Sequence, residues 1–111
     1  MYENANLSEK DEKTTLFYGN IDYTINYKGV MRMKVTEATI LRIRELSKAQ
    51  RLSMYELSYR TGMPPSTVKS IMNGKSKNPG IVNIKKIAEG LGMTIREFYD
   101  CDTFDNLEQD E

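Results

Sequence analysis

Apolar residues recur every third or fourth position through most of residues 36–99, the spacing that places side chains on one face of a helix. In the first such segment Thr36 is the expected N-cap, because its hydroxyl can accept a hydrogen bond from the first helical turn. Charged residues fill many of the positions between the apolar ones. The pattern predicts a first helix whose buried face carries Ile40, Ile43, Leu46 and Ala49.

A second helix is predicted by signals at both of its ends. Ser53 and Glu56 have the Ser-x-x-Glu spacing of a capping box, in which each side chain accepts a hydrogen bond from the other residue's backbone. Leu52 and Leu57 occupy the two positions of a hydrophobic staple. Gly62 is expected to end the helix, because helices commonly end at a residue with a left-handed backbone.

A third helix is predicted from Pro65 to Met72 or Asn73, with Gly74 ending it. Proline suits the first helical position, where a backbone N–H would have no partner inside the helix. The small polar residues and the apolar residues of this segment fall on opposite faces. The residues spaced to point inward are Val68, Ile71 and Met72.

Two further helices complete the pattern. Apolar residues from Ile81 to Leu91 define the fourth helix, which Gly92 closes. Thr94 and Glu97 form a second capping box, so a short fifth helix is expected over roughly residues 95–99. Five short helices in about sixty residues can bury one modest core, which indicates an all-α domain.

The N-terminal third follows other patterns. Residues 1–13 are polar and lack periodicity, which predicts a disordered leader. Apolar and polar residues alternate strictly from Ile21 to Tyr27, as in a half-exposed strand. A turn at Lys28-Gly29 and a second strand over residues 30–35 would complete a β-hairpin within residues 14–35. The alternative is a non-native leader, with translation starting at Met31 or Met33 and residues 1–32 outside the native protein.

The net charge of zero hides a strong segregation of charge. Residues 36–99 hold 11 lysines and arginines against 5 acids, whereas residues 100–111 hold 6 acids and no base. This division into a basic domain and an acidic tail is more informative than the overall charge. We expect the tail to be disordered and solvated; Phe104 and Leu107 could instead anchor a dimer or a partner, and the tail could compete with DNA for the basic face.

The composition excludes several kinds of chemistry. The chain has no histidine and one cysteine, so it offers no His-based catalysis or zinc ligation and no internal disulfide. No nucleophile–base pair is visible, and we expect neither an enzyme nor a cofactor or metal. No apolar stretch is long enough to cross a membrane, so we expect a cytoplasmic, nucleoid-associated protein.

The second and third helices, joined by a short glycine-bearing turn, have the outline of a helix-turn-helix. That motif places its second helix in the major groove of DNA. The outward face of the third helix carries small polar residues and one lysine, which phosphate would not repel. The residues predicted on that face are Pro65, Ser66, Lys69 and Ser70.

The same residues resemble the Cro and lambda-repressor-like helix-turn-helix family, also called XRE-like, over residues 40–99. The resemblance implies a five-helix lambda-repressor-like DNA-binding domain over residues 36–99, in a bacterial or phage protein. The matching positions are Ile43-Arg44-Glu45-Leu46, Leu52-Ser53, Glu56-Leu57-Ser58, Gly62, Ser66-Thr67-Val68, Asn73-Gly74-Lys75, Pro79, Ile87-Ala88 and Leu91-Gly92-Met93-Thr94.

Site residues follow from the resemblance, position by position. The start of the third helix reads bases in the family, which implies base contacts by Pro65, Ser66, Lys69 and Ser70. Lys69 could donate to guanine, or contact a phosphate instead. The implied phosphate contacts lie at the start of the second helix and after the third: Ser53, Met54, Tyr55, Thr67, Asn73, Lys75 and Lys77. Arg42, Arg44 and Arg51 are expected to be solvated.

Three departures from the family weaken the expectation of strong sequence specificity. Met54 stands where many members have a phosphate-binding glutamine, and Pro64-Pro65 replaces polar residues at the start of the recognition helix. Ser47 and Met72 replace an arginine and a glutamate that form an ion pair in many members. Losing both charges together costs little, because neither is left buried alone.

The function implied is a sequence-specific transcriptional regulator, a repressor acting as a homodimer on double-stranded DNA. Two alternatives stay open at this point. One is an antitoxin-like or phage-type repressor controlled by a protein partner; the other is a protein-interaction module that has lost DNA binding.

Overall fold

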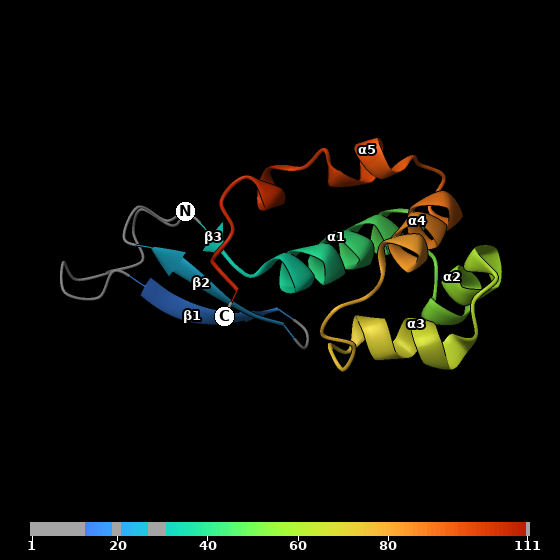
Figure 1. Cartoon of the computed structure of the whole chain (residues 1–111), viewed down its shortest axis with the longest axis horizontal. Coiled ribbons are helices and arrows are strands. Elements are labelled where there is room, and N and C mark those ends of the chain that lie inside the picture. The colour runs from blue at the N-terminus through green and yellow to red at the C-terminus, as the bar shows by residue number, and fades with distance from the viewer. Residues whose placement is uncertain (1–12, 19–20, 27–30, 111) are drawn as a thin grey trace.

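Five helices follow a small sheet along the chain (Figure 1). The computed structural model describes residues 13–18, 21–26 and 31–110. The helices are α1 (Val35–Ala49), α2 (Met54–Thr61), α3 (Pro65–Met72), α4 (Ile81–Gly90) and α5 (Ile95–Tyr99). The predicted five-helix domain is therefore confirmed, and a 3-10 helix, η2 (Asp102–Phe104), follows it.

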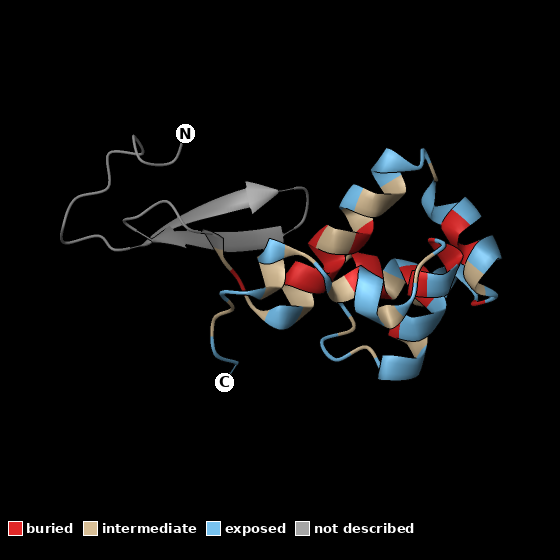
Figure 2. Ribbon diagram, turned by 90° about the horizontal axis from the view of Figure 1, so that it is seen from above, coloured by how far each residue is buried: buried red, intermediate tan, exposed pale blue. Residues whose placement is uncertain are grey.

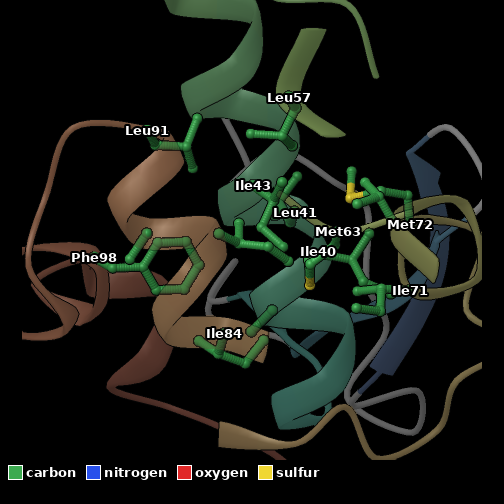
Figure 3. Close-up of a cluster of buried hydrophobic side chains, with 14 of the residues drawn as sticks. Ile40, Leu41, Ile43, Leu57, Met63, Ile71, Met72, Ile84, Leu91 and Phe98 are labelled. Carbon is green, nitrogen blue, oxygen red and sulfur yellow. The ribbon is translucent and has the colours of Figure 1, made fainter. Parts of the chain in front are cut away.

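The core of the molecule lies among the five helices. Each helix turns its apolar face inward, while its exposed residues cover the outside (Figure 2). Figure 3 shows how side chains from all five helices meet in this core. Members of the cluster include Ile40, Ile43, Leu57, Val68, Ile71, Ile84, Ile87, Leu91 and Phe98. On α1, Ala49 is exposed, so its predicted burial was wrong.

Both predicted capping boxes are present. Ser53 Oγ accepts from Glu56 N at 3.1 Å, and Glu56 Oε1 accepts from Ser53 N at 2.8 Å. Thr94 and Glu97 make the same reciprocal pair at 3.1 and 2.9 Å. Gly62 ends α2 with φ of 73°, a left-handed value that glycine adopts without strain. These helix ends are therefore set by residues within one turn of sequence.

The start of α1 differs from the prediction. Lys34, not Thr36, is the N-cap residue, and the Glu37 carboxylate accepts a hydrogen bond from the Lys34 N–H at 3.0 Å. The Thr36 hydroxyl donates instead to the carbonyl oxygen of Lys77, at 2.9 Å. Thr36 therefore ties α1 to the loop between α3 and α4, a partner that lies 41 residues away.

The N-terminal sheet is larger than the predicted hairpin. Its strands are β1 (Lys13–Tyr18), β2 (Ile21–Asn26) and β3 (Met31–Arg32), paired antiparallel in the order β1-β2-β3. The predicted pairing of β2 with the following segment is present, but β3 has only two residues because α1 begins at Val35. The prediction missed β1, and Lys13 begins it. The predicted disorder of residues 1–12 and the turn at Lys28-Gly29 lie outside the described residues.

The acidic tail is not the disordered segment that its composition predicted. Phe104 and Leu107 are partly buried against the core, and η2 lies against α1. Phe104 also contacts the ring of Tyr99, with ring centroids 4.7 Å apart. The Glu108 N–H donates to the Met33 carbonyl oxygen at 3.0 Å. The tail therefore closes over this chain's own core, which supports neither its role as a partner anchor nor competition with DNA.

Arg42 connects α1 to α5 and was wrongly predicted to be solvated. Its Nε donates to the Phe98 carbonyl oxygen at 2.7 Å, and its Nη2 donates to the Glu97 carbonyl oxygen at 3.0 Å. Carbonyls in the last turn of a helix have no partner inside the helix. Arg42 of α1 therefore supplies hydrogen-bond donors to carbonyl groups at the C-terminal end of α5.

We expect Arg42→Ala to lower the free energy of unfolding by about 1–2 kcal/mol, because two charge-assisted hydrogen bonds are lost. Urea denaturation followed by circular dichroism measures the change. Arg96→Ala is the matched control, since Arg96 is an exposed arginine on α5. Equal stability of the two variants would contradict a structural role for Arg42.

Candidate nucleic-acid interface

Helices α2 and α3 form a helix-turn-helix. The Gly62 N–H donates to the Ser58 carbonyl oxygen at 3.1 Å, which closes α2, and two residues later the Pro64 carbonyl starts α3 by accepting from Thr67 and Val68 at 3.0 and 3.3 Å. Pro65 is the first residue of α3, where its missing N–H costs nothing. The turn is short because the backbone groups at both of its ends bond to residues of the adjoining helix.

Glycine and serine let α2 pack closely on its neighbours. Ser58 is 1% exposed and its hydroxyl donates to the Met54 carbonyl oxygen at 2.9 Å. A Cβ atom on Gly90 of α4 would lie 3.0 Å from the Thr61 Cγ2 atom of α2. Such a contact is closer than side chains normally tolerate, so Gly90 sets how near α4 comes to the end of α2. No pattern in the sequence indicated this role.

The faces of α3 are divided as predicted. Val68, Ile71 and Met72 are buried in the core. The opposite face, which carries the predicted base-contacting residues, is open: Pro65, Ser66 and Lys69 are exposed, and Ser70 is half-buried. The open face of α3 therefore begins with an apolar residue, Pro65, and continues with polar residues.

The loop after α3 holds its lysines outward. Asn73 Oδ1 accepts from the Lys75 N–H at 3.2 Å, and the Ser76 N–H donates back to the Ser70 carbonyl oxygen at 3.1 Å. Lys75 and Lys77 are both exposed. These hydrogen bonds shape the loop that carries Lys75 and Lys77 directly after α3.

The predicted phosphate-contacting residues at the start of α2 are exposed. Ser53 uses its hydroxyl oxygen as an acceptor for the cap, so its proton can still be donated to a phosphate. Tyr55 is 73% exposed, and Met54 is 42% exposed at the first position of the helix. Thr67, on α3, is half-buried.

The cap also affects the charge at the start of α2. The hydrogen bonds from the Ser53 backbone N–H and then from the Ser53 side chain lower the pKa of Glu56 below its ordinary value. The Glu56 carboxylate is therefore ionised at neutral pH, and any stability it contributes is present there and lost as the pH falls through this lowered pKa. Its negative charge interacts favourably with the dipole at the start of α2. The same charge offsets part of the attraction of this helix end for a phosphate.

Tyr59 was not among the residues predicted to contact DNA. It lies one turn after Tyr55 on α2 and is 86% exposed. Both tyrosines line a shallow pocket of about 370 Å³ that also reaches Met63 and Pro65, the first residue of α3. The i,i+4 spacing of the two tyrosines was the signal that could have identified this surface.

Arg44 supports the recognition helix from behind, although it was predicted to be solvated. Its Nη2 donates to the carbonyl oxygen of Met72, the last residue of α3, at 3.1 Å. Arg51 is exposed, as predicted, and has a left-handed backbone with φ of 57°. Among the described residues, no three His, Cys, Asp or Glu side chains gather into a metal-binding group, and no helix is long and apolar enough to span a membrane.

Comparison with known proteins agrees with this geometry. The family model described as helix-turn-helix matches residues 40–98. The chain is also similar to the restriction-modification controller protein C.AhdI from Aeromonas hydrophila, for which a crystal structure is known; the two sequences are 34% identical. The structures superpose with a TM-score of 0.51, over 56% of this chain and 92% of that chain. No curated protein matches the chain. Since the family model spans more than half of the chain, the protein belongs to the helix-turn-helix family, in its Cro and lambda-repressor-like branch.

Proposed function

We propose that this DNA-binding transcriptional regulator is a homodimeric repressor that inserts α3 into the major groove of a two-fold related operator. The observation that carries the proposal is the open outward face of α3 beside exposed lysines. The likeness to C.AhdI, a controller protein, supports a role in controlling gene expression. A regulator of this kind would act on the nucleoid in the cytoplasm.

The proposed base contacts come from Pro65, Ser66, Lys69 and Ser70. The Lys69 ammonium has no ion-pair or hydrogen-bond partner among the described residues, so it is available to donate to guanine O6 or N7. Pro65 offers only apolar contact, for which a thymine methyl group is the natural partner. Few side chains therefore read bases directly, and pairing two half-sites would add the remaining specificity.

The proposed phosphate contacts surround that face. Lys75 and Lys77 lie in the loop that follows α3, and Ser53 and Tyr55 lie at the start of α2. Tyr59 is added to the set because its exposed phenol can donate a hydrogen bond to a phosphate oxygen. The complete set is Ser53, Tyr55, Tyr59, Thr67, Asn73, Lys75 and Lys77.

Selection from a pool of random duplexes tests this function. The full-length protein is mixed with the pool at two salt concentrations, and the bound duplexes are sequenced. We expect an enriched two-fold related motif. Binding should weaken as salt rises, because protein binding releases counterions from the DNA phosphates and high salt opposes that release. Absence of binding even at low salt would overturn the proposal.

An alternative from a different class is a protein-interaction module that has lost DNA binding. Met54 and the two prolines favour it, because they remove polar groups that bind DNA in other members of the family. It predicts no salt-dependent binding to any duplex. A repressor controlled by a bound protein, in contrast, would bind DNA in the selection and lose it when the partner is added.

A further inference from the structure

The loop between α3 and α4, residues 73–80, carries two of the proposed phosphate contacts, Lys75 and Lys77. Both side chains are exposed, so they do not themselves hold the loop against the domain. Where the two ammonium groups can reach therefore depends on the course of the main chain. That course is set by hydrogen bonds from other residues.

Hydrogen bonds within the chain segment around α3 order the first half of the loop. The Lys75 N–H donates to Asn73 Oδ1 at 3.2 Å, and the Ser76 N–H donates to the Ser70 carbonyl oxygen at 3.1 Å. Each of these bonds joins residues that are close in the sequence. The position of Lys75 is therefore fixed by the end of α3 itself.

The second half of the loop depends on α1 instead. The Thr36 hydroxyl donates to the Lys77 carbonyl oxygen at 2.9 Å. Among the described residues, this is the one hydrogen bond that residues 77–79 make. Arg44 of α1 also donates to the carbonyl oxygen of Met72, directly before the loop, at 3.1 Å. Helix α1 therefore contacts both the entry to the loop and the main chain that carries Lys77.

The Thr36 hydroxyl is free for this role because α1 is capped by other groups. The Lys34 N–H is satisfied by the Glu37 carboxylate, at 3.0 Å. Thr39, on the same helix, uses its hydroxyl in the usual local way and donates to the Val35 carbonyl oxygen at 2.8 Å. The two threonines therefore use the same group differently: Thr39 bonds within its own helix, and Thr36 bonds to the loop.

We propose that Thr36 is a positioning residue for DNA binding, which holds the Lys77 main chain so that this lysine meets a phosphate beside the groove that α3 enters. The proposal rests on the function proposed above, because phosphate contact by the loop is part of that function. A donor that is already in place binds at a lower entropic cost than one that must be ordered on binding. Without the Thr36 bond the loop samples other conformations, and only the fraction with Lys77 in place is competent to bind.

Thr36→Val tests the proposal, because valine keeps the shape of the side chain and removes the hydroxyl. We expect the dissociation constant for a selected duplex to rise about fivefold, the factor that corresponds to one ordinary hydrogen bond. The loss should be similar for all duplexes, since phosphate contacts carry no base preference. Thr36→Ser keeps the hydroxyl and should bind as the parent does. Fluorescence anisotropy of labelled duplexes measures the affinities.

Thr39→Val is the matched control. It removes a hydroxyl from the same helix, but the bond that is lost stays within α1. Thr39 is 4% exposed, so the control disturbs the core at least as much as Thr36→Val does. The control should leave the affinity for DNA unchanged. Equal weakening by the two variants would mean that any damage to α1 lowers DNA binding, and would overturn a specific role for Thr36.

A double variant tests whether Thr36 acts through Lys77. In a Lys77→Ala background the positioned charge is already missing, so Thr36→Val should weaken binding little further. In a Lys86→Ala background, which removes an exposed lysine of α4, Thr36→Val should keep its full effect. The slope of log affinity against log salt should fall by about one in Lys77→Ala and by the same amount or less in Thr36→Val. Full additivity of Thr36→Val and Lys77→Ala would overturn the route through Lys77.

The free protein gives a reading that does not need DNA. Backbone ¹⁵N relaxation should show lower order parameters for residues 76–79 in Thr36→Val than in Thr36→Ser, with the helices unchanged. A loop that is equally ordered in both variants would overturn the proposal. Normal DNA binding by the parent and by Thr36→Val alike overturns the role of Thr36 alone. A parent that binds no duplex overturns the proposed function, and the positioning role falls with it.

Discussion

Phe98→Ala is expected to lower the free energy of unfolding by about 3–5 kcal/mol, the usual cost of removing a fully buried phenylalanine. Phe98 is 0% exposed, and its ring packs edge-on against Tyr99 with ring centroids 5.0 Å apart. Phe104 lies on the same cluster, 6.5 Å away between ring centroids. Alanine would leave a cavity where α5, α1 and the C-terminal segment meet.

The size of this effect follows from the size of the domain. Small domains have a total stability of about 5–15 kcal/mol, so the variant should be largely unfolded well below the melting temperature of the parent. Thermal and urea denaturation followed by circular dichroism measure the change. The Arg42 hydrogen bond to the Phe98 backbone is available in both proteins, so the difference reports on the ring alone.

Tyr59→Ala is the control for this experiment, since it also removes an aromatic ring. Tyr59 is 86% exposed, so its loss should change the stability by less than about 0.5 kcal/mol. A Phe98→Ala variant as stable as the Tyr59→Ala variant would contradict the packing of α5 on the core.

Lys69→Ala is expected to weaken binding to the selected operator by about 1–3 kcal/mol and to relax the preference at one base pair. The expectation follows from the position of Lys69 in the middle of the exposed face of α3. Competition binding with a series of single-base operator variants measures both effects. Loss of affinity without a change in preference would mean that Lys69 contacts a phosphate.

Lys75→Ala provides the matched comparison, because it removes the same charge from the loop beside α3. It should weaken all duplexes alike and reduce the slope of log affinity against log salt by about one. Circular dichroism of both variants should match the parent, since neither lysine packs in the core. If Lys75→Ala instead changed the preferred sequence, the division between base-reading helix and phosphate-binding loop would be wrong.

The elements with local signals were predictable from the sequence. The ends of α2 and α5 depend on side chains only three residues from the groups they cap, and Gly62 supplies the left-handed residue at its own position. The inward and outward faces of α3 follow from helical spacing alone. The same spacing therefore sufficed to place the proposed base contacts on an open face of that helix.

Other parts of the site could not be predicted because their partners lie far away in the sequence. Arg44 reaches the end of α3 across 28 residues, and Thr36 reaches the loop that carries Lys77 across 41. Both are polar and lie outside the repeat of Ile40, Ile43 and Leu46, so in the sequence they look like ordinary surface residues. Their roles depend on how α1 lies against the rest of the domain.

The packing of the acidic tail could not be predicted from the sequence either. Its composition indicates a solvated segment, because six of its residues are acidic. Two apolar side chains and one backbone hydrogen bond to Met33 nevertheless hold it against the core. Composition averages over the segment, whereas packing depends on where those few apolar residues fall relative to the surface they cover.

The sequence by itself determined the helical elements, the caps of α2 and α5 and the helix-turn-helix, because these depend on hydrogen bonds and side-chain spacing within about one helical turn. The tertiary structure alone decided the hydrogen bonds from α1 to α3 and α5 and the packing of the tail against the core. Each of these is a property of the space between elements, and that space is set by the packing of side chains distant in sequence.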